Sequence, residues 1–69
     1  MMRKRTLLIN ARTSKGFTRP QLASKVGCTF EHIKRLEYGL VNPSTPLMFR
    51  ICSVLNAQPE DLFIETNNK

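Results

Sequence analysis

The chain has 69 residues and a formal net charge of +6, and 41% of its residues are hydrophobic. A chain of this length forms one domain, and it buries only about 60% of the surface that it exposes when unfolded. Nearly all of its apolar side chains are therefore needed for a single core. Little material is left for an enclosed substrate pocket, so we expect no enzyme and no cofactor.

The charge is unevenly distributed along the chain. Residues 1–35 carry nine Lys and Arg side chains and one acidic side chain, a net charge of +8. Residues 36–69 carry two basic and four acidic side chains, a net charge of −2. A basic half is typical of a surface that faces a polyanion. A merely solvated basic surface is the alternative, because many small proteins carry one.

The cysteines and the apolar runs indicate in which cellular compartment the protein is expected. Cys28 and Cys52 lie in no CxxC motif, and His32 is the single histidine, so we expect reduced thiols and no metal site. No apolar run approaches the roughly 18 residues that cross a membrane. The run Leu7-Leu8-Ile9 is shorter than the core of a signal peptide, about 7 to 15 residues. The sequence therefore predicts a cytoplasmic protein that does not bind membranes.

Glycine and proline divide the chain into five short segments, and none alternates like a strand, so each is predicted to be a helix. The first covers about residues 5–14 and is ended by Gly16. The second follows Thr18, which forms a capping box with Gln21, and it ends near Val26. The third follows Thr29 and ends near Tyr38.

The fourth segment is predicted to begin at Ser44 or Thr45, next to Pro46. Its apolar stripe has helical spacing and consists of Met48, Ile51, Cys52 and Leu55. The last segment is a short helix that begins at Pro59 and packs Leu62 and Phe63 against the core. Five short helices joined by short connections predict a compact all-α domain.

Residues 19–38 have the pattern of a helix, a tight turn and a second helix. The pattern needs apolar contacts between the helices, a small residue where they approach, and a glycine in the turn. Six residues meet these needs at suitable offsets: Leu22, Ala23, Val26, Gly27, Ile33 and Leu36. Each is common alone, but their combination is specific.

With its flanking residues, this pattern resembles a known family. The matching residues are Gly16-Phe17-Thr18, Gln21-Leu22-Ala23, Val26-Gly27, Ile33, Leu36-Glu37-Tyr38-Gly39, Asn42-Pro43, Leu55 and Asp61-Leu62. They look like the Cro/repressor-type (XRE) helix-turn-helix domain of phage and bacterial regulators, over about residues 7–63. The resemblance implies a five-helix lambda-repressor-like fold whose third helix enters the major groove of DNA.

The resemblance also implies a structural ion pair between Arg12, late in the first helix, and Glu37, late in the third. We place the helix-turn-helix domain at residues 7–64, between a basic arm at residues 1–6 and a polar tail at residues 65–69. The arm either lies along the DNA backbone or is a disordered, solubilising terminus.

The third helix is predicted to have two faces. If Ile33, Leu36 and Glu37 face inward, the outward positions are Phe30, Glu31, Lys34, Arg35 and Tyr38. Arg35 is the best candidate for reading a base, because its guanidinium can hold O6 and N7 of guanine together. Glu31 could accept from a cytosine amino group, and Phe30 could pack on a thymine methyl group.

Each of these side chains has a second interpretation. Lys34 and Arg35 could contact phosphates only, and Glu31 could be an acidic residue that suits the first turn of a helix. Phe30 departs from the polar side chain usual at this family position, so it could instead contact a protein.

Phosphate contacts are expected beside this helix. Arg19 occupies the family position that opens the second helix, and it can clamp the DNA backbone. Further candidates are Thr18, Thr29, Tyr38, Asn42, Ser44 and Thr45. Both Thr18 and Thr29 also serve as helix caps.

These features together predict sequence-specific binding of double-stranded DNA by a bacterial or phage transcriptional regulator, most simply a repressor. One small domain contacts few base pairs, so we expect a homodimer on a palindromic or pseudo-palindromic operator. The last helix, with Phe63 and Ile64, is the candidate dimer face. The alternative is an adaptor or antitoxin-like module whose Phe30 and Tyr38 surface binds a regulatory protein partner.

Overall fold

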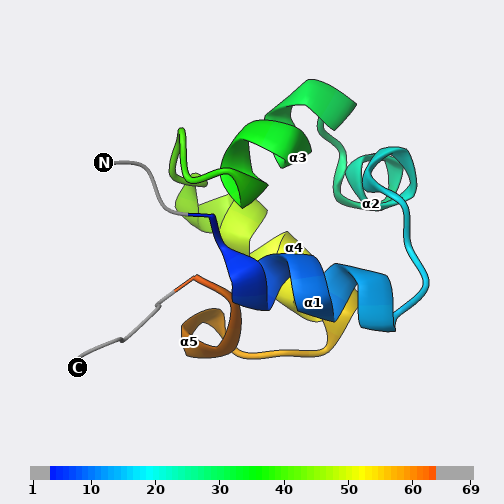
Figure 1. Cartoon of the computed structure of the whole chain (residues 1–69), viewed down its shortest axis with the longest axis vertical. Helices are drawn as coiled ribbons and strands as arrows, with labels where there is room; N and C mark the ends of the chain where they lie inside the picture. Colours follow the sequence, from blue (N-terminus) through cyan, green and yellow to red (C-terminus); the bar gives the residue numbers. More distant parts are fainter. Residues whose placement is uncertain (1–3, 64–69) are drawn as a thin grey trace.

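Helices form most of residues 4–63, the part of the chain that this computed structural model describes (Figure 1). In chain order they are α1 (Thr6–Ser14), α2 (Arg19–Val26), α3 (Phe30–Glu37), α4 (Thr45–Leu55) and α5 (Pro59–Leu62). Residues 4–63 contain no strand. The predicted all-α class and the order of its helices are confirmed.

Local hydrogen bonds fix where the helices begin. The hydroxyl of Thr18 accepts from the peptide N–H of Gln21 at 3.2 Å, and the Gln21 side chain accepts from the Thr18 N–H at 2.9 Å. These are the two contacts of a capping box. Thr29 caps α3, and Ser44, rather than Thr45, caps α4, each through its side-chain oxygen. Short polar side chains therefore satisfy peptide donors that a helix leaves unpaired at its start.

The core is built from one side of each helix. Its buried members are Leu8, Leu22, Ala23, Val26, Ile33, Leu36, Leu47, Ile51, Cys52, Leu55 and Leu62. The stripe predicted for α4 is correct for Ile51, Cys52 and Leu55 but not complete. Leu47 is buried and Met48 is only half-buried, because Leu47, Ile51 and Leu55 lie on one line of helical spacing.

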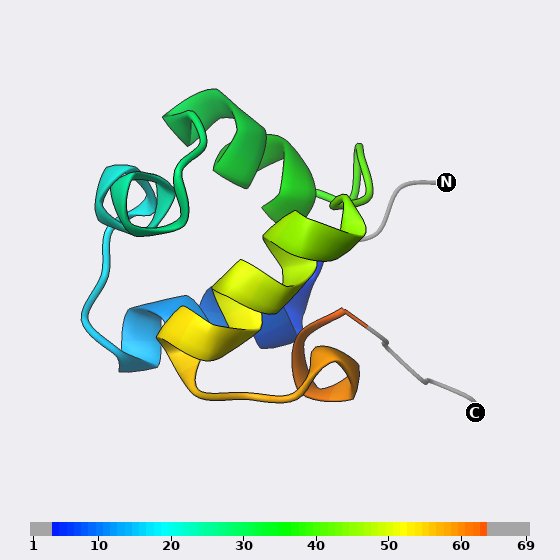
Figure 2. The ribbon, with the colours of Figure 1, turned by 180° about the vertical axis from the view of Figure 1, so that it is seen from behind.

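The five helices pack against one another around this core, with α4 also against α5. Helix α2 packs against α3 and α4, and α1 packs against α5 and α3. Seen from behind, α4 runs diagonally across the molecule from the loop after α3, and the connection that follows it turns back along the lower edge to α5 (Figure 2). None of the described helices is long and apolar enough to cross a membrane. Helix α3 is therefore held by α2 and α1 on its inner side, and its outer side is exposed.

Candidate nucleic-acid interface

The turn between α2 and α3 determines how α3 is presented. The peptide N–H groups of Gly27 and Cys28 both donate to the carbonyl oxygen of Ala23, at 2.9 and 3.0 Å. Gly27 has φ +78°, and a Cβ built on it would meet no heavy atom within 4 Å. The turn therefore requires glycine for its backbone conformation rather than for space.

The apolar contacts of the helix-turn-helix lie where the sequence analysis expected them. Leu22, Val26, Ile33 and Leu36 are at most 1% exposed, and Ala23 is 3% exposed. One further contact, which the sequence did not predict, joins α4 to this pair of helices. Nε of Arg50, on α4, donates to the carbonyl oxygen of Val26 at 2.9 Å and so ties α4 to the end of α2.

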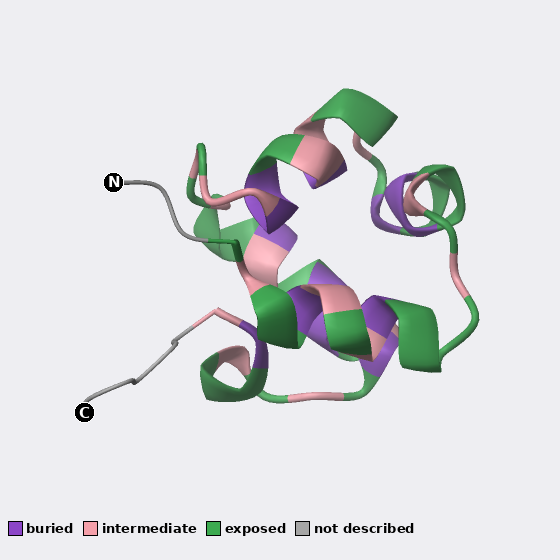
Figure 3. Cartoon of the chain, in the orientation of Figure 1, coloured by how far each residue is buried: buried purple, intermediate pink, exposed green. Residues whose placement is uncertain are grey.

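Helix α3 has a buried and an exposed face. Ile33, Leu36 and Glu37 have no exposed surface, whereas Glu31 and Arg35 are exposed and Lys34 is half-buried. Figure 3 shows exposed residues on the outer side of α3 and buried ones toward the rest of the domain. A helix that reads the major groove presents an exposed face of this kind to the base edges.

Two of the predicted base-reading side chains contact each other. Nε of Arg35 lies 3.6 Å from Oε2 of Glu31, one turn earlier, and both side chains are more than half exposed. An exposed pair of this kind contributes little to stability. Arg35 can therefore leave Glu31 for another hydrogen-bond acceptor at small cost.

Phe30 opens the outer face of α3. Its side chain is 43% exposed, which is high for a large aromatic residue. It borders a shallow hollow that is also lined by Phe17, Thr18, Arg19 and Pro20. Apolar carbon is thus available at the start of α3, as contact with a thymine methyl group requires.

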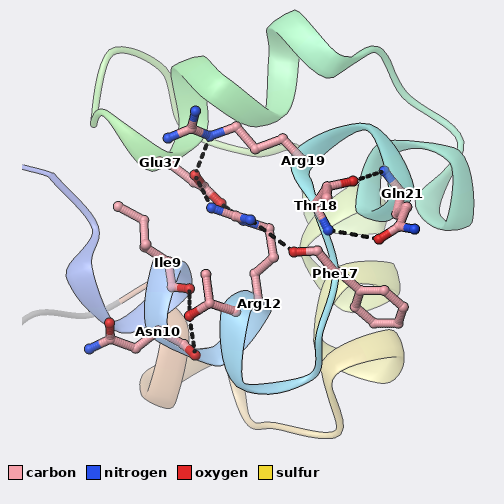
Figure 4. Close-up of polar contacts among 9 residues, drawn as sticks. Ile9, Asn10, Arg12, Phe17, Thr18, Arg19, Gln21 and Glu37 are labelled. Carbon is pink, nitrogen blue, oxygen red and sulfur yellow. Dashed lines mark hydrogen bonds and ion pairs between the residues drawn. The ribbon is translucent and has the colours of Figure 1, made fainter.

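A buried carboxylate holds α3 on α1 and α2. Nε of Arg12 lies 2.5 Å from Oε2 of Glu37, and a second nitrogen of Arg12 donates to Oε1 at 3.3 Å (Figure 4). The third nitrogen of Arg12 donates to the carbonyl oxygen of Phe17 at 2.9 Å. Arg12 is 8% exposed and Glu37 is fully buried. The structure thus contains the pair that the family resemblance implied, and each of the three guanidinium nitrogens of Arg12 donates a hydrogen bond.

Arg19 shares the same carboxylate. Its Nε donates to Oε1 of Glu37 at 2.8 Å, and its side chain is 27% exposed. This hydrogen bond raises the pKa of Arg19, against the opposing effect of partial burial. In Figure 4 the two terminal nitrogens of Arg19 point away from Glu37. The sequence analysis assigned Arg19 to phosphate only, and that assignment stays a prediction.

Tyr38, which was predicted to project outward, lies close to two cations. Nζ of Lys4 and Cζ of Arg19 each lie 5.4 Å from the centroid of its ring. Tyr38 as a whole is half-buried. The guanidinium carbon of Arg19 lies over this ring. Both cations are within the range of cation–π attraction.

The other predicted phosphate ligands are mostly engaged in local contacts. The side-chain oxygens of Thr18, Thr29 and Ser44 serve as helix caps. Thr45 is exposed at the first position of α4, and Oδ1 of Asn42 accepts from Arg5 at 2.6 Å. Their phosphate contacts stay predictions, and a helix N-terminus still offers peptide N–H groups at each cap.

Arg5 is the main residue that the sequence analysis misplaced. Its Nη1 donates to the carbonyl oxygens of Leu36 and Val41, at 2.6 and 2.9 Å, and its peptide N–H donates to that of Glu37 at 2.7 Å. Arg5 thus fastens the start of α1 to the end of α3. The predicted arm at residues 1–6 does not extend this far, because Thr6 already belongs to α1. Residues 1–3 lie outside the described part of the chain, as do Ile64 and the tail at residues 65–69.

The thiols and the histidine form no common site. Burial raises the pKa of both Cys28 and Cys52. The peptide N–H of His32 donates to the Thr29 hydroxyl at 3.1 Å. Within residues 4–63, no three His, Cys, Asp or Glu side chains form a group that could hold a metal ion.

The sequence is similar to a known protein family and to individual members of it. A helix-turn-helix family model, of the Cro/C1 type, matches residues 8–62. A protein of Archaeoglobus fulgidus, named an uncharacterized helix-turn-helix transcriptional regulator, is 47% identical over 60 residues, which are 87% of this chain and 86% of that protein.

Two solved structures are similar in fold and sequence. The restriction-modification controller protein C.AhdI of Aeromonas hydrophila has a TM-score of 0.76 and 28% identity, over 84% of this chain and 88% of that one. The clp gene regulator ClgR of Corynebacterium glutamicum has a TM-score of 0.76 and 29% identity, over 86% of this chain and 63% of that one. The chain belongs to the Cro/C1-type helix-turn-helix family of DNA-binding transcriptional regulators.

Proposed function

We propose that this regulator is a repressor that binds a palindromic or pseudo-palindromic operator as a homodimer, with α3 of each subunit in the major groove. One observation carries the proposal. The inner face of α3 is fully buried, while Glu31 and Arg35 on its outer face are more than half exposed. A helix held this firmly by its inner side can present its outer side chains to base edges in a fixed register.

In this proposal the outer face of α3 reads the sequence. Arg35 donates two hydrogen bonds to a guanine, a contact that discriminates between bases by about 1 to 3 kcal/mol. Glu31 accepts from a cytosine amino group, and Phe30 packs on a thymine methyl group. Lys34 supplies a further polar contact from the same face.

Residues around α3 set its position on the duplex. The DNA backbone is held by Arg19, by Tyr38, and by the caps and loops that surround α3, from Thr18, Thr29, Asn42, Ser44 and Thr45. Such contacts give affinity without sequence preference. The basic character of residues 1–35, with a net charge of +8, supports this assignment.

The homodimer follows from geometry rather than from a contact in this chain. Two recognition helices reach successive major grooves when they are about 34 to 36 Å apart, so a dimer can read a two-fold symmetric site. Helix α5 with the half-buried Phe63 is the proposed dimer face. Sedimentation of the protein, free and on DNA, is expected to show a dimer, and a strict monomer in both states would contradict it.

Selection of bound duplexes from random DNA tests the proposal as a whole. We expect the wild-type protein to enrich one sequence with two-fold symmetry. When the same selection is carried out with Arg35→Ala, we expect the enrichment of guanine at one position of that sequence to be lost. If the wild-type protein enriches no duplex sequence, the proposed operator binding is wrong. A surface that binds a protein partner instead would give that result.

A further inference from the structure

The side chain of Arg5 joins the end of α3 to the residue that follows α5. Its Nη1 donates to the carbonyl oxygens of Leu36 and Val41, at 2.6 and 2.9 Å. Its Nη2 donates to Oδ1 of Asn42 at 2.6 Å. The guanidinium carbon lies 5.8 Å from the centroid of the Phe63 ring. One residue therefore contacts the last turn of α3, the loop after it and the end of α5.

Both ends of this link are favourable contacts. The last carbonyl oxygens of a helix have no partner within the helix, and the helix dipole favours a cation beside them. Arg5 supplies two donors there, because its peptide N–H also donates to the carbonyl oxygen of Glu37 at 2.7 Å. At the other end, a guanidinium within about 6 Å of an aromatic ring is attracted to it. Arg5 thus limits the movement of α3 relative to Phe63.

The packing of the helices shows why this link matters. Helix α1 packs against both α3 and α5, and Arg5 immediately precedes it. Figures 1 and 2 both show the start of α1 between the end of α3 and the segment after α5. A second route from α5 to α3 passes through α4 and then α2. Arg5 connects the two segments through a single residue.

The two segments have different roles in the proposed dimer. Helix α3 reads the bases, whereas Phe63 lies on the proposed dimer face. The two recognition helices must lie about 34 to 36 Å apart to enter successive major grooves. This separation depends on how α3 is placed relative to Phe63 within each subunit. A contact that fixes this placement therefore also fixes the distance between the recognition helices.

We propose that Arg5 is a positioning residue that determines which spacing of half-sites the dimer accepts, without contacting DNA itself. One base pair added between the half-sites turns one of them by about a tenth of a helical turn relative to the other. A dimer whose α3 is held firmly must strain itself or the DNA to bind such a site. When the hold of Arg5 is loosened, α3 moves and the strain is relieved. The inference rests on the proposed function, because it needs a dimer joined through α5.

The test compares the selected operator with duplexes in which one base pair is inserted or removed between the half-sites. Fluorescence anisotropy measures the affinity of each duplex at one KCl concentration. The spacing ratio is the affinity for the selected operator divided by the affinity for an altered duplex. For the wild type we expect a spacing ratio of about 10, a loss comparable to that of one mismatched base pair.

Arg5→Lys is the main variant. It keeps the positive charge but replaces the fork of donors with one ammonium group, which cannot hold the same set of oxygens. We expect the spacing ratio to fall by about threefold, within the range by which single residues change the coupling between sites. Affinity for a duplex with one isolated half-site is expected to stay close to that of the wild type. If the half-site and all longer duplexes are weakened by the same factor, Arg5 only stabilises each subunit and the inference is wrong.

Phe63→Leu tests the other end of the link. It removes the ring and leaves the hydrogen bonds of Arg5 in place. In a variant that sedimentation shows to be a dimer, we expect the spacing ratio to fall in the same direction. Adding Arg5→Lys to Phe63→Leu is expected to lower the ratio by less than Arg5→Lys does alone, because the link is already broken. Full additivity of the two changes would contradict a shared link.

Two further variants are controls, and circular dichroism checks that every variant is folded. Lys4→Gln removes a charge next to Arg5, from a residue whose ammonium group contacts the Tyr38 ring instead. It is expected to change the affinity for every spacing by the same factor. Ile51→Val removes a methyl group from a fully buried side chain of α4 and is expected to lower stability with no change in the spacing ratio. An equal fall of the ratio in Ile51→Val and Arg5→Lys would assign the effect to stability and overturn the inference.

The inference and the proposed function fail in different ways. If the wild type is a strict monomer on DNA or selects no duplex with two half-sites, the proposed function itself is wrong. If the wild type binds its operator as a dimer but Arg5→Lys keeps the same spacing ratio, the role of Arg5 is wrong and the proposed function stands. A wild type that binds all spacings equally well would also overturn the role of Arg5.

Discussion

Helix α3 carries two glutamates that pair with arginines, and the surroundings of the two carboxylates differ. Glu37 is fully buried, and its carboxylate lies 2.5 Å from Arg12. Glu31 is exposed, and its carboxylate lies 3.6 Å from Arg35. The same two chemical groups therefore occur on one helix, once inside the protein and once at its surface.

The difference indicates that the two ends of α3 have different roles. A buried ion pair is costly to break, so Glu37 fixes how α3 sits on α1. An exposed pair of this spacing contributes only about 0.3 to 0.5 kcal/mol, less than the 1 to 3 kcal/mol of a bidentate guanine contact. Arg35 can therefore exchange Glu31 for DNA, whereas Arg12 cannot leave Glu37 without loss of stability.

The largest expected effect comes from the buried side. Glu37→Leu leaves Arg12 buried without its carboxylate, and we expect the free energy of unfolding to fall by about 3 to 5 kcal/mol. Urea denaturation followed by circular dichroism measures this change. The double variant Arg12→Met, Glu37→Leu is expected to recover most of the loss, because the buried guanidinium of Arg12 is removed together with the carboxylate, and Arg19, the other partner of Glu37, is 27% exposed and keeps access to water. If Glu37→Leu alone lowers the free energy of unfolding only slightly, the buried pair is no more important for stability than the exposed pair, and the comparison is wrong.

The second effect concerns Arg5, which joins the buried end of α3 to the loop after it. Arg5→Ala leaves the carbonyl oxygens of Leu36 and Val41 without this charged donor, and we expect a loss of about 1.5 to 3 kcal/mol in the same denaturation experiment. Lys4→Ala is the control, and it is expected to change stability by less than about 0.5 kcal/mol. Equal losses in both variants would show that the start of the chain acts as one unit.

The fold was predictable because its signals are local. A capping hydroxyl, a proline in the first turn and a glycine after the last turn act within a few residues of each helix end. Thr18 and Gly27 are examples, since each acts on peptide groups nearby. The outer side of α3 followed from helical spacing once Ile33, Leu36 and Glu37 were placed inward, and the family resemblance implied the ion pair of Glu37 with Arg12.

The contacts of Arg5 and Arg19 that were not predicted leave no trace in the sequence. Arg5 donates to carbonyl oxygens 31 and 36 positions away, and every residue has such an oxygen. Arg19 shares a carboxylate that the family resemblance assigned to Arg12 alone. Arg12 on α1 and Arg19 on α2 share this carboxylate because both helices pack α3 so that their arginines reach Glu37. The spacing of residues within one helix does not reveal how the helices are placed relative to one another.

The third effect lies on the exposed side and appears in DNA binding. Arg35→Ala is expected to reduce discrimination at one base position by about 1 to 3 kcal/mol and to leave stability nearly unchanged. Affinities for the selected duplex and for its variants at that position measure the first part. Arg19→Ala is the comparison, since it is expected to weaken all sequences alike. Equal weakening of every sequence by Arg35→Ala would reassign Arg35 to phosphate.

The smallest effect is expected from the other partner of the exposed pair. Glu31→Ala removes the contact with Arg35 and an acidic side chain from the first turn of α3, so stability should fall by about 0.5 kcal/mol or less. Because salt screens exposed charges, the difference from the wild type should disappear when urea denaturation is repeated at high KCl. Glu37→Leu should keep its large loss at the same salt, since its charges are not open to solvent. A loss above about 1 kcal/mol in Glu31→Ala that persists at high salt would make the outer pair structural as well, and Arg35 would then not be free to turn to a base.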